Sequence, residues 1–443
     1  MRGRIAGAGV LALGVAAGLA AVLLDWSVPA RAAIIAATCV ALWLGELAPV
    51  WVPTLLLWAA TPLLLATSND AFAPARVLGW SVDPVLALFL GGFALAAAAC
   101  AQGADRRVAA LALRLSRGRP VRLVVLVALA TAVLSMWMSN VAAAALMLAA
   151  LRPVVDGDDS PAGSLRRPLL LAIALAADVG GIATPVGTGS NGIVMAALEP
   201  THPISFVQWM SFGVPLAFGL LAVALAVVVW RVRPAGVIAL PTLPPSRVTA
   251  ATWRLGAVFG ATVLLWLTEP LHGLRAWVVA LGAVAALVLA GLLGWRDVRR
   301  MDWSTLLLIA GGIALGALLD ASGLVRTGAA HVPLAGAPPF VRLLALCLVS
   351  ALLSAVMSNT ATAAFLVPLA LTLDPAPSTA VIVAVSTSLG VPFVISTPPN
   401  AMAVGTGLLR SRELLVPGLV IMLGGCVLVA LTGPVVLRAF GIP

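Results

Sequence analysis

The chain has 443 residues, of which 62% are hydrophobic and only 9% are charged. Soluble proteins carry about 25% charged residues. The composition therefore excludes a soluble globular protein, a disordered chain, collagen and a disulfide scaffold, and it indicates an all-α polytopic membrane protein. The 26 basic residues are all Arg and outnumber the 16 acidic ones. In so apolar a chain we expect them to be topology signals at the cytoplasmic face, and we expect a lipid bilayer as the partner and no nucleic acid.

Apolar runs of spanning length predict eleven transmembrane helices. In chain order these runs are 5–24, 32–50, 52–66, 84–103, 168–198, 204–230, 252–268, 275–294, 303–322, 378–408 and 412–438. Residues 105–119 carry Arg on one face and Val, Leu and Ala on the other, which predicts an interfacial helix. Residues 236–251 are predicted to be a cytoplasmic linker.

Two further apolar stretches, 121–150 and 340–373, are each about 30 residues long and carry a Ser-Asn pair near the middle. Such a stretch is too long for one span and suits two half-length helices that meet at a tip. We therefore predict two re-entrant hairpins.

The distribution of Arg predicts the orientation of the chain. With the N-terminus inside and 121–150 treated as a hairpin, 20 Arg fall on the inner face and 6 on the outer face. This bias predicts a bacterial-type cytoplasmic (inner) membrane protein with its N-terminus inside and its C-terminus outside.

The sequence also repeats itself in order. Met138-Ser139-Asn140 recurs 219 residues later as Met357-Ser358-Asn359. The other matches are Trp43–Glu46 with Trp266–Glu269, Asp83–Gly92 with Asp302–Gly312, and Thr188–Asn191 with Thr397–Asn400. We predict an extra N-terminal span at 1–30, followed by repeats at 31–235 and 252–443. Each repeat holds five spans and a hairpin, and because five is odd the second repeat must be inverted, as in secondary transporters.

Polar and helix-breaking residues interrupt the apolar pattern twice in each half. One interruption is the Ser-Asn pair of each hairpin, and the other is a run of Gly, Thr, Pro and Asn that should unwind the spans 168–198 and 378–408. Unwound backbone at membrane depth is tolerated only where it lines a cavity. Freed N–H groups favour an anion, and freed carbonyls beside Ser, Thr and Asn oxygens suit Na⁺. The pattern predicts a cation-coupled anion carrier with broken helices at the midplane, although interhelical hydrogen bonding would also explain such residues.

These motifs resemble the divalent anion:sodium symporter family, which carries dicarboxylates, citrate and sulfate. The resemblance rests on Ser358-Asn359-Thr360 and its partner Ser139-Asn140, and on Ser396-Thr397-Pro398-Pro399-Asn400. It implies Na⁺ as coupling ion, no organic cofactor, a homodimer, and an elevator mechanism. In that mechanism the hairpins and broken spans move against a scaffold made of the spans up to about residue 104 and those at 252–322.

The resemblance also implies two ion sites and a substrate site. A first Na⁺ site would use Ser135, Ser139, Asn140 and Gly187, and a second would use Ser354, Met357, Asn359 and Ser396. The implied substrate contacts are Asn140, Thr188, Asn359, Thr360, Thr397 and Pro398.

Three positions depart from the family pattern. Val141 replaces a hydroxyl, Thr188-Gly189-Ser190-Asn191 replaces Pro-Pro-Asn, and Asp178 lies inside a span where a small neutral residue is expected. An ionisable group in a span is a functional candidate, so Asp178 is a candidate coupling residue, with a structural role as the alternative. Glu46 and Glu269 are interpreted as scaffold residues.

We expect a transporter and no enzyme, because no span carries a catalytic motif. The leading substrate is a C4 dicarboxylate. Sulfate or tricarboxylate transport, Na⁺-independent anion exchange, Na⁺/H⁺ antiport and a channel stay open as alternatives.

Overall fold

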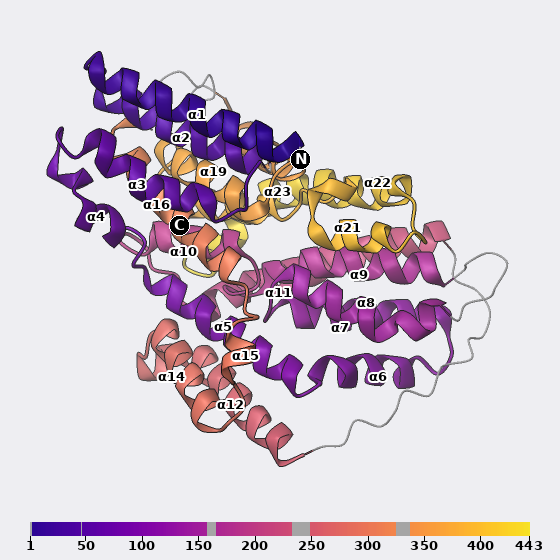
Figure 1. The fold of residues 1–443 in the computed structure, drawn as a ribbon. Helices are drawn as coiled ribbons and strands as arrows, with labels where there is room; N and C mark the ends of the chain where they lie inside the picture. Colours follow the sequence, from indigo (N-terminus) through magenta and orange to yellow (C-terminus); the bar gives the residue numbers. More distant parts are fainter. Residues whose placement is uncertain (1, 46, 157–164, 233–248, 325–336) are drawn as a thin grey trace.

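The computed structural model describes residues 2–45, 47–156, 165–232, 249–324 and 337–443. The described chain is helical and contains no β-strand (Figure 1). This confirms the predicted all-α fold. Glu46 and most of the linker 236–251 lie outside the described residues.

The first half contains eleven α-helices in the described residues. They are α1 (Arg2–Leu23), α2 (Val28–Leu44), α3 (Val52–Leu65), α4 (Pro74–Gly79), α5 (Pro84–Ala101), α6 (Ala104–Ser116), α7 (Pro120–Ser135), α8 (Asn140–Asp156), α9 (Arg166–Gly180), α10 (Gly189–Leu198) and α11 (Phe206–Val232). Single 3₁₀ turns lie at Asp70–Phe72 and at Gly181–Ala183.

The second half follows a similar order. Its helices are α12 (Ala250–Leu267), α13 (Glu269–His272), α14 (Ala276–Leu289), α15 (Trp295–Val298), α16 (Trp303–Ala321), α18 (Pro339–Ser354), α19 (Asn359–Leu373), α20 (Pro377–Thr387), α21 (Pro398–Gly405), α22 (Ser411–Leu419) and α23 (Gly425–Ala439). A 3₁₀ turn lies at Val394–Ser396, and a π-helical turn at Val420–Gly424 joins α22 to α23.

Each predicted span contains a helix or a pair of helices, and each predicted hairpin is a helix pair. Six described helices are long and apolar enough to cross a membrane on their own. The shorter apolar helices include both hairpins and both broken spans, where polar, Gly or Pro residues divide the apolar run. The predicted interfacial helix is α6, and the short helices α4, α13 and α15 were not predicted.

The two halves pack on each other through reciprocal close contacts. A Cβ added to Gly91 of α5 would lie 2.5 Å from the Cβ of Ala280 in α14. Its repeat counterpart, Gly311 of α16, would meet the Oγ1 of Thr54 in α3 at 2.1 Å. Thr54 also donates a hydrogen bond to the Leu307 carbonyl of α16 (2.8 Å). Because α5 needs a helix of the second half and α16 needs one of the first, neither half can pack correctly without the other.

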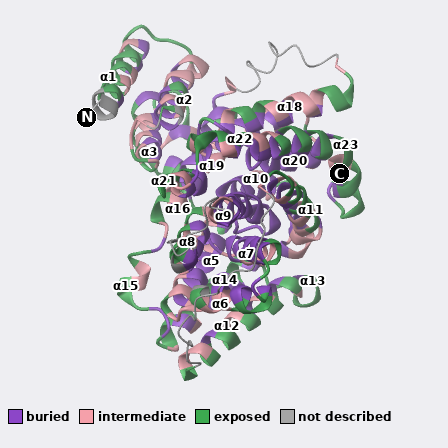
Figure 2. Ribbon diagram, turned by 90° about the vertical axis from the view of Figure 1, so that its right-hand side faces the viewer, coloured by how far each residue is buried: buried purple, intermediate pink, exposed green. Residues whose placement is uncertain are grey.

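Burial increases from the rim to the centre. Every residue of α9 from Pro168 to Gly180 is buried, whereas α1 and α12 expose most of their apolar side chains (Figure 2). A surface this apolar would be unfavourable in water, but lipid solvates it. The gradient therefore fits a chain whose rim faces the bilayer and whose centre holds the broken helices.

Aromatic rings join the tip of the first hairpin to α12. Trp137, between α7 and α8, stacks on Trp266 with ring centroids 6.1 Å apart, and Phe206 stacks on Trp266 at 4.5 Å. Glu269 accepts a hydrogen bond from the Phe206 backbone N–H (3.2 Å). Glu269 thus caps the start of α11, which agrees with the scaffold interpretation of this residue.

Candidate functional site

Both hairpin tips are held by the same Ser–Asn pair. Ser135 lies within hydrogen-bond distance of Asn140 Oδ1 (3.0 Å) and donates to the Ala177 carbonyl of α9 (2.6 Å). Ser354 donates to Asn359 Oδ1 (2.7 Å). Because Oδ1 faces the Ser hydroxyl in each pair, the side-chain NH₂ of each Asn points elsewhere and remains as a donor.

The helices that leave the hairpin tips are capped by the preceding Ser. Ser358 accepts from the Ala361 N–H (3.2 Å), and Ser139 accepts from the Ala142 N–H (3.4 Å). A Ser cap satisfies one of the free N–H groups of a helix N-terminus. The remaining first-turn N–H groups of α8 and α19 stay free for other partners.

Each helix break is fixed by an Asn that the sequence analysis did not assign to the site. The side-chain NH₂ of Asn191 donates to the carbonyls of Gly181 (2.9 Å) and Thr184 (2.8 Å). Asn400 donates in the same way to Val391 (3.0 Å) and Phe393 (3.1 Å). Both residues are fully buried, and their repeat spacing was the available signal. These two amides replace the helical hydrogen bonds that each break removes.

The helix that follows each broken span, α11 in the first half and α22 in the second, packs a glycine against the unwound backbone. A Cβ on Gly213 of α11 would lie 2.9 Å from the Ile182 carbonyl oxygen. A Cβ on Gly418 of α22 would lie 2.4 Å from the Cα of Pro392. Trp209 also donates to the Ile182 carbonyl (3.0 Å). The breaks are therefore held from both sides.

A cavity of about 180 Å³ lies between the hairpin tips and the breaks. It brings together all of the predicted substrate contacts, which are Asn140, Thr188, Asn359, Thr360, Thr397 and Pro398. Ser139, Gly187, Ser396 and Asp178 also line it. Ser135, Ser354 and Met357 do not line the cavity and are buried beside it.

Four helix N-termini converge on this cavity. Asn140 begins α8, Gly189 begins α10, Asn359 begins α19 and Pro398 begins α21, and all four residues line the cavity. A helix N-terminus carries about half a positive charge. Among the described residues, no Arg lines this cavity. Helix N-termini and amide donors are therefore what this cavity offers an anion, opposite the carboxylates of Asp178 and Asp302, which also line it.

Two oxygens of the predicted first Na⁺ site lie close together beside Gly181, and we call this group the Asn140 cradle. A Cβ on Gly181 would lie 2.5 Å from Asn140 Oδ1 and 3.0 Å from the Gly187 carbonyl oxygen. Two oxygens that converge on a space without a side chain suit a small hard cation. In the second half, Ser354 and Asn359 are paired and Ser396 lines the central cavity, whereas Met357, predicted to contribute its backbone carbonyl, is buried and does not line the cavity.

Asp178 connects the first break to the second. Its Oδ2 accepts a hydrogen bond from the Thr397 hydroxyl (2.8 Å), and its Oδ1 has no partner among the described residues. The side chain is fully buried. The sequence analysis placed Asp178 beside the first break, but it did not predict a contact with a residue 219 positions away.

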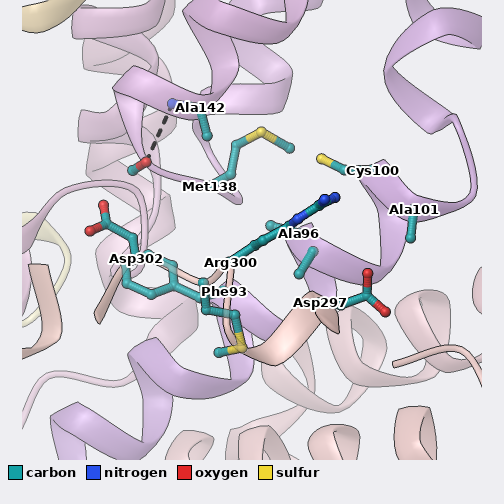
Figure 3. Close-up of a pocket in the computed structure, with 12 residues that line it drawn as sticks. Phe93, Ala96, Cys100, Ala101, Met138, Ala142, Asp297, Arg300 and Asp302 are labelled. Atoms are coloured by element: carbon teal, nitrogen blue, oxygen red, sulfur yellow. Dashed lines mark hydrogen bonds between the residues drawn. The ribbon is translucent and has the colours of Figure 1, made fainter. Parts of the chain in front are cut away.

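A second cavity of about 290 Å³ adjoins the first and shares Phe93, Ser139 and Asp302 with it. Figure 3 shows the Arg300 side chain reaching into this cavity beside Cys100. Asp302 accepts from both the backbone N–H (3.0 Å) and the hydroxyl (2.7 Å) of Thr305, so its carboxylate is occupied as a cap of α16. Among the described residues Arg300 has no ion pair.

Apolar helices, paired re-entrant hairpins and broken helices around a central cavity define a membrane transporter rather than an enzyme. The chain belongs to the citrate transporter family, whose pattern matches residues 40–390. The predicted resemblance to divalent anion:sodium carriers is confirmed. The fold is similar to that of the YdaH transporter of Alcanivorax borkumensis, with a TM-score of 0.55 and 18% identity over 80% of this chain and 85% of that one.

Three relatives illustrate the range of this similarity. An uncharacterized transporter of Haemophilus influenzae is 29% identical and covers 88% of both chains. The sodium-dependent dicarboxylate transporter SdcS of Staphylococcus saprophyticus is 27% identical over 84% of this chain and 79% of its own length. The inorganic phosphate transporter PHO87 of Saccharomyces cerevisiae is 30% identical over 65% of this chain and 32% of its own length.

Proposed function

We propose that the protein is a secondary active transporter that couples the uptake of a small divalent anion, a C4 dicarboxylate, to Na⁺. The observation that carries this proposal is the convergence of four helix N-termini on one cavity that no Arg of the described segments lines. Helix termini and amides attract the anion, and Na⁺ at the Asn140 cradle would supply the missing positive charge. The similarity to SdcS supports the same assignment.

The proposed transport cycle is an elevator movement in a homodimer in the inner membrane, with the N-terminus inside. The two inverted repeats at 31–235 and 252–443 each contribute scaffold spans, one hairpin and one broken span. The hairpin tips and breaks would carry Asn140, Asn359, Thr360 and the bound ions as one unit. The hydrogen bond from Ser135 to the Ala177 carbonyl joins the first hairpin to the first broken span, and the hydrogen bond from Thr397 to Asp178 joins the two breaks, so both would keep this unit together while it moves.

Purified protein in proteoliposomes tests the coupling. We expect uptake of labelled succinate or malate down an inward Na⁺ gradient to fall at least about tenfold when choline replaces Na⁺, because the site then lacks its balancing cation. Protein-free liposomes are the control. Counterflow that proceeds equally well without Na⁺ would instead support anion exchange. Na⁺/H⁺ exchange without uptake of any divalent anion would contradict the proposal.

Arg300 is expected to raise the capture rate of the anion without contacting it in the central cavity. Arg300→Gln should raise KM about 3- to 10-fold with kcat nearly unchanged, and the difference should shrink at high ionic strength, because a charge at a cavity mouth acts by steering. Arg299→Gln is the matched control, since Arg299 is also exposed but does not line the cavity. Equal KM values for the two variants would contradict this role.

A further inference from the structure

Thr397 is already used as a hydrogen-bond donor before a substrate binds. Its hydroxyl donates to Asp178 Oδ2 at 2.8 Å, and its oxygen accepts from the Asn400 backbone N–H at 3.4 Å. A hydroxyl has one proton and two acceptor sites. Thr397 therefore has a single acceptor site left for a substrate in the cavity.

The equivalent Thr of the first half is in a different position. Thr188 shares a hydrogen bond with Ser190 (3.4 Å), and it has no hydrogen bond to a carboxylate in the part of the chain that the structure describes. The repeat counterpart of Asp178, at the same distance before the second break, is Ser388. The cavity is consequently asymmetric, because the Thr397 proton is taken by a carboxylate whereas the Thr188 hydroxyl shares a hydrogen bond only with the Ser190 hydroxyl and can still donate.

The chemistry of an oxyanion site makes this asymmetry selective. A fully deprotonated oxyanion has only acceptor oxygens. If one of these oxygens faces the remaining acceptor site of Thr397, no hydrogen bond can form between them, and that contact is unfavourable. An anion that carries an O–H group can donate to Thr397 while its remaining oxygens accept from Asn140, Asn359 and the helix N-termini. Val141, which replaces a hydroxyl of the family pattern, removes one donor for a bare carboxylate at the opposite tip.

We infer that the transported anion carries an O–H group directed at Thr397, and that Asp178 is the positioning residue that imposes this preference by taking the Thr397 proton. The inference rests on the proposed anion transport and narrows its substrate class. Hydrogen phosphate and hydroxydicarboxylates share this chemistry, whereas sulfate and unsubstituted dicarboxylates lack it.

Two matched pairs of anions test the inference in proteoliposomes that contain the whole chain. Phosphate, at a pH where it is the singly protonated dianion, is compared with sulfate, and malate is compared with succinate. For the wild type we expect the O–H member of a transported pair to have a KM at least about tenfold lower at similar kcat. The pair that is transported distinguishes an inorganic from an organic substrate.

Variants separate positioning from a merely structural role. In Asp178→Asn the amide can donate to Thr397 and free its proton for the cavity, so the preference should vanish or reverse. Thr397→Val should lose the preference and Thr397→Ser should keep it. Asp320→Asn is the matched control, because Asp320 lies on α16 outside the cavity.

The outcomes are distinguishable. Wild-type protein that takes up neither pair would refute the proposed function. Wild-type uptake without preference, or an unchanged preference in Asp178→Asn, would overturn this inference and leave the transporter assignment intact. Should Asp178→Asn fail to fold, an unchanged preference in Thr397→Val would overturn the inference in the same way.

Discussion

Replacement of Asn359 by Ala is expected to reduce anion uptake by about 100-fold or more. The substitution removes the side-chain NH₂ donor at the start of α19, removes an oxygen from the proposed second Na⁺ site, and leaves the buried Ser354 hydroxyl without its acceptor. Hydrogen bonds to charged groups contribute about 1.5–3 kcal/mol each, and about 1.4 kcal/mol corresponds to a tenfold change. Asn140→Ala should behave similarly.

Initial uptake rates in proteoliposomes, normalised to the amount of folded protein, are the measurement. Asn69→Ala is the matched control, since Asn69 caps a surface turn and does not line the cavity. Ser354→Ala should retain transport but require a higher Na⁺ concentration for half-maximal rate. Uptake within twofold of wild type in Asn359→Ala would refute the placement of the site at the hairpin tips.

The second large effect concerns folding. Gly180→Ala and Gly390→Ala should each destabilise the protein by about 2 kcal/mol or more, because overpacking at a rigid contact typically costs about 1–3 kcal/mol. A Cβ on Gly180 would lie 2.6 Å from the Ala132 carbonyl oxygen of α7. A Cβ on Gly390 would lie 2.6 Å from the Ala351 carbonyl oxygen of α18. Because both clashes are with backbone atoms, a change of side-chain rotamer cannot relieve them.

Thermal unfolding in detergent and the yield of monodisperse protein measure this effect. Gly219→Ala in α11 and Gly256→Ala in α12 are matched controls, because a Cβ at either position meets nothing within 4 Å. Both controls should be neutral or slightly stabilising, as Ala favours a helix more than Gly does. A Gly180→Ala protein as stable as these controls would contradict the close packing of broken span on hairpin.

The interruptions of the apolar pattern were the informative part of the sequence. Polar, Gly and Pro residues cost free energy inside a span, so Ser139-Asn140, Ser358-Asn359 and the two Gly/Pro runs marked the hairpins and breaks that the structure contains. Contacts between the halves left no such local signal. The hydrogen bond from Thr397 to Asp178 and the Arg300 cavity depend on how distant helices pack, which periodicity does not encode.

The roles of Asn191 and Asn400 lie between these cases. Both residues belong to a sequence repeat, but the resemblance assigns substrate contact only to the nearby Thr188 and Thr397. In the structure the amides of Asn191 and Asn400 bind backbone carbonyls, and the Thr residues line the cavity. The repeat indicated that the Thr and Asn positions share a functional region. Only the structure shows that the Asn residues stabilise the backbone of the breaks and that the Thr residues line the cavity.

The stack of Trp137, Phe206 and Trp266 has a consequence for the energy balance of transport. The proposed movement carries the first hairpin past α12, so the Trp137 ring would leave both Trp266 and Phe259 of α12. Aromatic pairs contribute about 0.5–1.5 kcal/mol each beyond the area they bury. Losing two such contacts would shift the equilibrium between the two end states by roughly 5- to 150-fold. In the proposed cycle this stack would therefore favour the end state in which it forms, and bound ions and substrate would have to overcome that preference in each turnover.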